Sequence, residues 1–117
     1  MDLSPKRSGK ALILHPKGRI NHLNAAAFEE AIAPHVAECK SSGSKLLLDL
    51  SELEYVSSAG LRVFMLAAKK LLPGGGNMAV AAAPPVVTEI LQISRFNLVF
   101  PLYGSVADAL AAFAAAP

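Results

Sequence analysis

The sequence predicts a single α/β domain in which a mixed, mostly parallel sheet of four to five strands is covered by about four helices. Short apolar runs alternate along the chain with segments of helical periodicity, which is the order that parallel strands with crossover helices require. Three consecutive leucines at residues 46–48, with Leu50 after Asp49, have the continuous apolar character of a strand buried on both faces. A length of 117 residues fits one domain with its own core.

The N-terminal region predicts two or three short strands. Residues 11–15 alternate weakly between apolar and polar side chains, and a turn with a short extended piece follows at residues 16–20. Residues 3–6 can pair only at the edge of a sheet, because Pro5 has no N–H to donate to a central ladder. We therefore expect residues 1–9 to form an edge strand or a mobile N-terminus.

The first helix is predicted over residues 25–39. Asn24 is a favourable N-cap, and residues 41–43 contain the serine and glycine signals of a helix end. Pro34 lies inside the run and is expected to bend or shorten the helix, because it removes one backbone hydrogen bond. The apolar residues that recur at four-residue steps are Phe28, Ile32 and Val36.

The central segment, residues 45–72, joins the leucine-rich strand to a second helix. A short polar turn after the strand leads to Ser57 and Ser58, and a helical period begins at Leu61. The serines are thus expected where a strand passes into a helix N-terminus, at the edge of the sheet where α/β folds place function. The predicted core stripe of this helix is Leu61, Phe64, Met65, Ala68 and Leu72.

A proline and three glycines at residues 73–76 predict a flexible connection. A phosphate-binding loop would need its glycines between a strand and a following helix, with Lys and Ser or Thr behind them. Here the glycines lie between a helix and a strand, so phosphate binding is not expected.

The last third of the chain predicts strand, helix, strand and helix. Residues 77–83 have strand character, and the two prolines at the start of residues 84–93 suit the first turn of a helix. A short last strand is expected at residues 98–100. Ser105 with Asp108 three positions later resembles a capping box and begins the final helix.

Composition excludes several classes of function. The net charge of +2 and the basic residues Lys6, Arg7 and Lys10 come without interleaved aromatic residues, so nucleic-acid binding is not expected. The single cysteine, Cys39, cannot form an internal disulfide, and no apolar signal core precedes the domain, which favours a cytoplasmic protein. No apolar run is long enough for membrane insertion, and no spacing indicates a metal or cofactor site.

Ser58 is the candidate functional residue. At the N-cap or first turn of a helix, free N–H groups and the positive end of the helix dipole accommodate an anion, so a phosphate there would cost the fold little. The alternative is that Ser57 or Ser58 simply caps the helix, and the spacing alone favours the cap.

A catalytic serine is the weaker hypothesis. The nucleophile elbow Gly-x-Ser-x-Gly is absent around Ser58. Nothing in the sequence connects His15, His22 or His35 to that serine as a base. A small serine hydrolase therefore remains an alternative without its base or oxyanion elements, and no catalytic residue is expected.

Two further features accompany the serines. Asp49 ends the leucine-rich strand, and its carboxylate is expected to accept backbone hydrogen bonds from the following turn. Val63 and Leu66 lie on a second side of the predicted helix, flanked by Arg62 and Lys69. Such an apolar area with a basic rim suits a partner-binding face, although a second buried contact explains it equally well.

These residues also carry a family resemblance. The run Leu-Leu-Leu-Asp-Leu-Ser at residues 46–51, followed by Tyr-Val-Ser-Ser-Ala-Gly-Leu-Arg-Val at residues 55–63, resembles the core of STAS domains, in particular the bacterial anti-sigma factor antagonists. Gly-Arg-Ile-Asn-His-Leu-Asn at residues 18–24 is similar to the Gly-x-Leu-Asp turn of that family. The resemblance covers essentially the whole chain, 1–117.

The resemblance implies a partner-switching protein. In that family the unphosphorylated form binds an anti-sigma factor that is also a serine kinase of the GHKL type, and a PP2C-type phosphatase resets the switch. The phosphorylated serine falls on Ser58, whereas the acidic residue that precedes it in the family is replaced by Ser57, a rival phosphorylation site. Asn21 likewise stands where the family often has Asp.

The resemblance also implies which residues contact the partner, and it leaves two other roles open. We expect a monomer or weak dimer. The same domain could serve as the STAS subunit of a lipid-transport ABC system or as a stressosome-like scaffold. The expected partner-binding residues are Asn21, Ser57, Ser58, Ala59, Gly60, Arg62, Val63 and Leu66.

Overall fold

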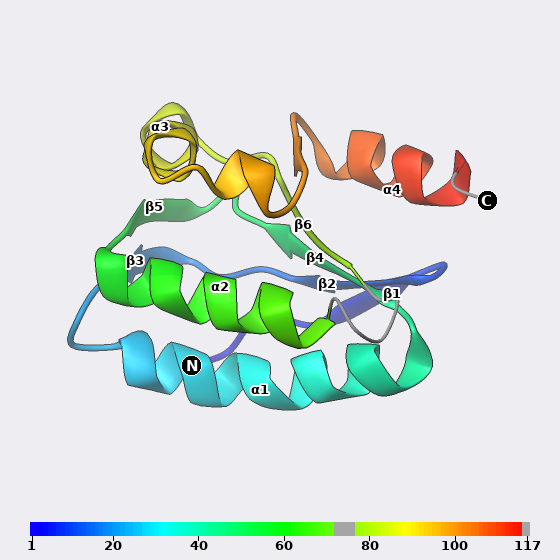
Figure 1. Cartoon of the computed structure of the whole chain (residues 1–117), viewed down its shortest axis with the longest axis horizontal. Helices are drawn as coiled ribbons and strands as arrows, with labels where there is room; N and C mark the ends of the chain where they lie inside the picture. Colours follow the sequence, from blue (N-terminus) through cyan, green and yellow to red (C-terminus); the bar gives the residue numbers. More distant parts are fainter. Residues whose placement is uncertain (72–76, 116–117) are drawn as a thin grey trace.

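The computed structural model describes residues 1–71 and 77–115 and has a five-stranded sheet at its centre, shown in Figure 1. The strand order is β1-β2-β4-β6-β7, and only β1 runs antiparallel to its neighbour. This confirms the predicted mixed, mostly parallel sheet. The strands are β1 (Lys6–Ser8), β2 (Ala11–Leu14), β4 (Lys45–Asp49), β6 (Met78–Ala81) and β7 (Leu102–Tyr103).

A second, two-stranded sheet was not predicted. It pairs β3 (Gly18–Ile20) with β5 (Leu53–Val56) in parallel. The sequence suggested only a polar turn for β5, which has just four residues and contains the exposed Glu54. Figure 1 shows β5 lying between two helices, α2 and α3. Pairing with the distant strand β3 is therefore what makes this segment a strand.

Four α-helices lie in the described residues, in agreement with the prediction, and they cover the sheet unequally. In Figure 1 α1 and α2 lie together on one side of the sheet, and α4 lies on the other. Strand residues alternate between the two sides, so Leu46 and Leu48 join the larger core, whereas Leu47 belongs to a smaller cluster with Ala109 of α4. The helices are α1 (Ala25–Ser42), α2 (Ser58–Leu71), α3 (Pro85–Ile93) and α4 (Val106–Ala115).

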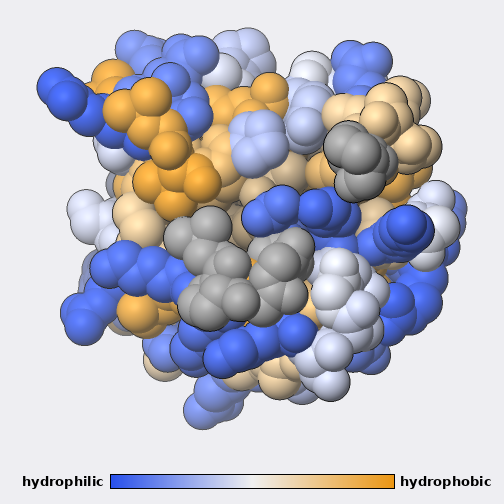
Figure 2. All heavy atoms as spheres, turned by 45° about the vertical axis from the view of Figure 1, so that its right-hand side comes forward, coloured by the Kyte–Doolittle hydropathy of each residue, from blue (hydrophilic) through white to orange (hydrophobic). Residues whose placement is uncertain are grey.

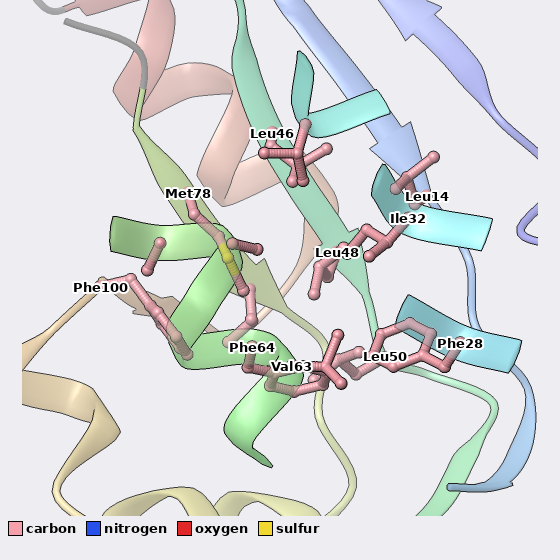
Figure 3. Close-up of a cluster of buried hydrophobic side chains, with 14 of the residues drawn as sticks. Leu14, Phe28, Ile32, Leu46, Leu48, Leu50, Val63, Phe64, Met78 and Phe100 are labelled. Atoms are coloured by element: carbon pink, nitrogen blue, oxygen red, sulfur yellow. The ribbon is translucent and has the colours of Figure 1, made fainter. Parts of the chain in front are cut away.

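The larger core, part of which is shown in Figure 3, fixes α1 and α2 against the sheet. Phe28 of α1 meets Phe64 of α2 edge to face, with ring centroids 5.7 Å apart. Aromatic pairs of this geometry add about 0.5–1.5 kcal/mol to the area they bury. Because α2 is held in this way, the position of its first residues is set by the core.

Pro34 was expected to bend or shorten helix α1, and the shortening is wrong. The helix is neither ended nor shortened there, and it continues to Ser42 before Gly43, at φ 76°, closes it with a hydrogen bond from its N–H to the Cys39 carbonyl. Pro34 is exposed, and so is Glu30, whose carbonyl loses its partner. Solvent can satisfy that carbonyl, which is why the proline is tolerated.

Two predicted strands, one near the N-terminus and one near residue 100, differ from those in the structure. The N-terminal edge strand is β1 at Lys6–Ser8 and not residues 3–6, where Ser4 has a positive φ of 46°. The strand expected at residues 98–100 is wrong, because a 3-10 turn η2 (Phe96–Leu98) occupies this region and the strand follows as β7. Phe96 and Phe100 are both buried, with ring centroids 5.6 Å apart, so their spacing of four reflects a turn and not a strand.

Other predictions near the C-terminus are confirmed. Helix α3 begins at Pro85, and the strand predicted within residues 77–83 is β6. The Asp108 N–H donates to the Ser105 hydroxyl oxygen at 3.0 Å, which is the expected cap of α4. The predicted flexible connection at residues 73–76, like Leu72, lies outside the described residues.

The end of the molecule that carries the β1–β2 turn and α4 is turned forward in Figure 2. Hydrophilic residues are mixed there with smaller hydrophobic areas. Helix α2 begins at the opposite end, on the left of Figure 1. Among the described residues, no helix combines the length and apolar character needed to cross a membrane.

Candidate functional site

The two serines stand on either side of the start of α2. The Ser57 N–H donates to the Ile20 carbonyl of β3 at 2.8 Å, and the Ser57 carbonyl accepts from the Leu61 N–H at 2.8 Å. The Ser57 hydroxyl oxygen also accepts a longer bond, 3.4 Å, from the Gly60 N–H. Ser57 is therefore the N-cap of α2, with its backbone and side chain both engaged.

Ser58 is the first residue of α2 and is exposed. Within residues 1–71 and 77–115, its hydroxyl has no hydrogen-bond partner. Ser57 is only half-exposed and its hydroxyl supports the cap. The chemically available hydroxyl of the pair is thus that of Ser58.

Gly60 fixes how closely α2 approaches the small sheet. A Cβ at this position would lie 2.7 Å from Cγ2 of Ile20 and 2.7 Å from Cγ2 of Val56. Real Cβ atoms do not come this close to a branched side chain, so only glycine allows the contact. Gly60 is buried, which places it in the packing beneath the serines and not on the surface expected for a partner.

The buried side of α2 is turned relative to the predicted stripe. Phe64 and Ala68 are buried as expected, but Leu61 and Met65 are only partly buried. Val63, one of the expected partner-binding residues, is 4% exposed and packs in the main core, which is the buried contact that the sequence left open as an alternative. The expected exposure of Leu66 is confirmed at 36%. Arg62 is exposed and Ala59 is partly so.

Asn21 lies in the turn between β3 and α1, one residue after the strand whose Ile20 carbonyl holds Ser57. Its side-chain oxygen accepts from the Leu23 N–H at 2.9 Å, a role that the carboxylate of Asp could also fill. Asn24 is the N-cap residue of α1, as predicted, but its side chain makes no capping hydrogen bond. Its side-chain oxygen accepts from the Asn21 N–H and its amide donates to the Arg19 carbonyl, so it ties the turn together.

An aromatic and cationic pair near the serines was missed by sequence reasoning. The Arg19 guanidinium lies over the Tyr55 ring, with its carbon 4.6 Å from the ring centre. The two residues are register partners in the β3–β5 sheet. No sequence signal joined them, because their contact depends on a strand pairing that the residue pattern did not predict.

Asp49 behaves as predicted. Its side-chain oxygen accepts from the Ser51 N–H at 3.0 Å in the turn after β4. Near this turn the His15 Nε2 atom lies 3.4 Å from the Ser51 hydroxyl and 3.2 Å from a Glu52 carboxylate oxygen. Both contacts use the same ring nitrogen, whereas a catalytic triad needs one partner on each nitrogen.

Other chemistries find no support in the described part of the chain. No group of three or more His, Cys, Asp or Glu residues there could hold a metal ion. The Cys39 thiol is buried, and this burial raises its pKa, which disfavours the reactive thiolate. The remaining candidate for a functional group in this part of the chain is the exposed hydroxyl of Ser58, which lies beside the exposed face of α2.

Comparison with known proteins agrees with this architecture. The STAS domain family model matches residues 3–109. BtrV of Bordetella bronchiseptica, assigned as an anti-sigma factor antagonist, is 36% identical over 113 residues, covering 97% of this chain and 95% of that protein. The anti-sigma-F factor antagonist RsfB of Mycobacterium tuberculosis is 30% identical over 98 residues, covering 84% of this chain and 77% of RsfB.

A solved structure has the same fold. The crystal structure of an anti-sigma factor antagonist from Mycobacterium paratuberculosis superposes with a TM-score of 0.81 at 28% identity, covering 92% of this chain and 89% of that one. The family match spans most of the chain, and the alignments with the two relatives cover 95% and 77% of their lengths. The chain belongs to the STAS domain family.

Proposed function

We propose that this protein is an anti-sigma factor antagonist, a cytoplasmic binding module without catalysis of its own, and that phosphorylation of Ser58 switches its binding. The names of its relatives at 36% and 30% identity support the class of function. The observation that carries the switch is the exposed hydroxyl of Ser58 at the start of α2, which has no hydrogen-bond partner among the residues that the structure describes. Ser57, which caps the helix, is the less suitable acceptor.

The proposed mechanism is electrostatic gating. Unmodified, the face of α2 around Ser58, Arg62 and Leu66 docks an anti-sigma factor that is also a serine kinase of the GHKL type. A phosphate on Ser58 adds about −1.5 to −2 charges at the edge of that face. The helix N-terminus stabilises this charge within the protein, whereas an acidic or apolar partner surface does not. A PP2C-type phosphatase restores the binding form.

The test has two steps. Phosphopeptide mass spectrometry on the protein from its own cells asks whether Ser58 or Ser57 is modified. Immobilised Ser58→Ala and Ser58→Asp proteins are then exposed to extract from the same cells, and the anti-sigma factor retained is identified and purified. We expect it on the alanine variant and not on the aspartate variant.

A matched control distinguishes an effect of a charge at position 58 from an effect of the net charge of the protein. Ser51 is another exposed serine, in the turn after β4 and outside α2. Ser51→Asp adds the same charge and is expected to retain the partner. Loss of the partner with both aspartate variants would show that net charge, and not a switch at Ser58, controls binding.

A further inference from the structure

The exposed side of α2 forms a single line of residues that begins at Ser58. Arg62 follows four positions later, and Leu66 and Lys69 continue the line at helical steps. The opposite side of the helix packs in the core through Phe64 and its neighbours. Residues four apart on a helix are surface neighbours, with Cβ atoms about 5–6 Å apart. Arg62 is therefore the charged side chain nearest along α2 to the Ser58 hydroxyl.

A second feature of Arg62 is that the described residues do not engage its guanidinium. Across the ranges 1–71 and 77–115, its guanidinium takes part in no hydrogen bond or ion pair. The acidic residue that faces this part of α2 from α1 is Glu29, which lines the groove between the helices together with Leu66 and Lys70. Glu29 forms no ion pair with Arg62. The guanidinium is thus available both to an external acidic group and to a group on Ser58.

The neighbouring serine has no such cation. Four residues after Ser57 stands Leu61, which is apolar and partly buried. A phosphate on Ser57 would therefore lack the helical neighbour that a phosphate on Ser58 has. The four-residue spacing therefore gives Ser58, but not Ser57, a cationic neighbour on the surface of α2.

We propose that Arg62 is the residue through which the state of Ser58 is read. In the unmodified protein its guanidinium binds a carboxylate on the acidic surface of the partner. In the phosphorylated protein the phosphate takes that guanidinium for itself. This inference rests on the proposed switch and adds a cause to it. Phosphorylation of Ser58 would remove the attraction between Arg62 and the partner's carboxylate, and it would also add a repulsion between the phosphate and the acidic surface of the partner.

The competition follows from the geometry of arginine. Its planar fork of N–H donors binds one carboxylate or one phosphate with two parallel hydrogen bonds. A phosphate on the same helix surface is held next to the fork at all times, whereas the partner's carboxylate must arrive from solution. The intramolecular pair therefore competes with the partner's carboxylate for the same guanidinium and weakens the attraction to the partner.

The test needs no partner. Protein carrying phosphoserine at position 58, made by genetic encoding so that no kinase is required, is titrated by ³¹P NMR. An arginine at i+4 is expected to lower the second pKa of the phosphate by ~0.3 relative to the Arg62→Gln variant. The helix dipole acts equally on both proteins and cancels in this difference. Lys69→Gln, which removes a charge farther along the same line, is expected to leave the pKa as in the wild type.

Salt supplies a second readout. In about 1 M NaCl the difference between wild type and Arg62→Gln is expected to collapse, because surface charges are screened within about 3 Å. Equal phosphate pKa values for the two proteins at low salt would overturn the role of Arg62. So would a difference that Lys69→Gln reproduces in full.

Different results would contradict the proposed switch at Ser58 and the proposed role of Arg62. If Ser58→Asp binds the purified anti-sigma factor as well as Ser58→Ala does, the switch itself is wrong, whatever the NMR titration shows. If the switch operates but Arg62→Gln leaves the phosphate pKa unchanged at low salt, only the role of Arg62 is wrong. With the inference correct, unmodified Arg62→Gln binds the partner about 5- to 10-fold more weakly.

Discussion

Ser57 and Ser58 are adjacent in the chain, but the backbone gives them different environments. Ser57 ends the segment from β5 and uses its N–H, carbonyl and hydroxyl to join β3 to α2. Ser58 is the first helical residue, and its hydroxyl has no hydrogen-bond partner among the described residues. The sequence showed two serines at a helix start and the resemblance favoured the second. Only the hydrogen bonds show why the first is less available.

Replacing Ser57 tests this division. Ser57→Ala removes the cap, and we expect the free energy of unfolding to fall by about 0.5–1 kcal/mol, at the lower part of the usual range because the hydroxyl bond is long. Urea denaturation measures the change. Ser58→Ala is the matched control and should alter stability by less than about 0.5 kcal/mol. A larger loss for Ser58→Ala than for Ser57→Ala would reverse the assignment of the cap.

Gly60 offers a second residue-scale prediction. An added Cβ would meet Ile20 and Val56 at 2.7 Å each. Overpacking of this kind costs about 1–3 kcal/mol, which exceeds the ~1 kcal/mol that alanine gains over glycine inside a helix. Gly60→Ala should therefore lower the free energy of unfolding, measured by thermal or urea denaturation.

Gly104 provides the comparison for that substitution. A Cβ there would meet only a side-chain oxygen of Asp108, at the ordinary distance of 3.8 Å. Gly104→Ala is expected to be neutral or slightly stabilising, because it restricts the unfolded chain. If both variants were equally stable, the close approach of α2 to the small sheet would not be a determinant of the fold.

At the scale of elements, α2 shows what periodicity can and cannot predict. The pattern indicated a helix, and a helix is there, but only part of the predicted stripe is fully buried: Phe64 and Ala68 are, whereas Leu61 and Met65 are partly exposed. Apolar residues occupy most sides of α2, including Leu61, Val63, Met65 and Leu66, so several stripes fit the same period. The buried side of α2 packs against α1, β5 and β6, and β5 was not predicted.

Two substitutions on α2 separate its inner and outer sides. Val63→Ala removes buried methyl groups and is expected to lower stability by about 1–3 kcal/mol. Leu66→Glu changes a residue that is 36% exposed and should cost less than about 1 kcal/mol. It should nevertheless weaken partner binding at least about 10-fold, since an acidic group enters the proposed docking face.

The measurements for this pair are urea denaturation and titration of the purified anti-sigma factor. Val63→Ala, compared at a temperature where both proteins are folded, should bind nearly as the wild type does. Wild-type affinity for Leu66→Glu would remove the outer face of α2 from the interface.

At the scale of the whole molecule, the sequence predicted the class of fold, the number of helices and the mostly parallel sheet. It did not predict strand order or the separate β3–β5 sheet, because both depend on pairings between distant segments. The strand placed at residues 98–100 failed for a related reason: two buried phenylalanines four apart fit a turn over the core as well as they fit a strand.

The fold places the candidate switch at one end of the molecule and leaves the core intact behind it. Ser58 is exposed, whereas Gly60 and Val63, two and five residues later, are buried. A phosphate at Ser58 would therefore change the charge of a surface without disturbing the packing beneath it. The switch is expected to act by what the partner meets and not by refolding of the domain.

The affinity of the purified anti-sigma factor for the Ser58 variants tests this account most directly. Titration calorimetry at physiological salt should give Ser58→Ala an affinity close to that of the wild type. Ser58→Asp and the phosphoserine protein should bind at least about 100-fold more weakly, a difference of about 2.7 kcal/mol. Equal affinity of all four proteins would contradict the claim that the state of Ser58 controls binding.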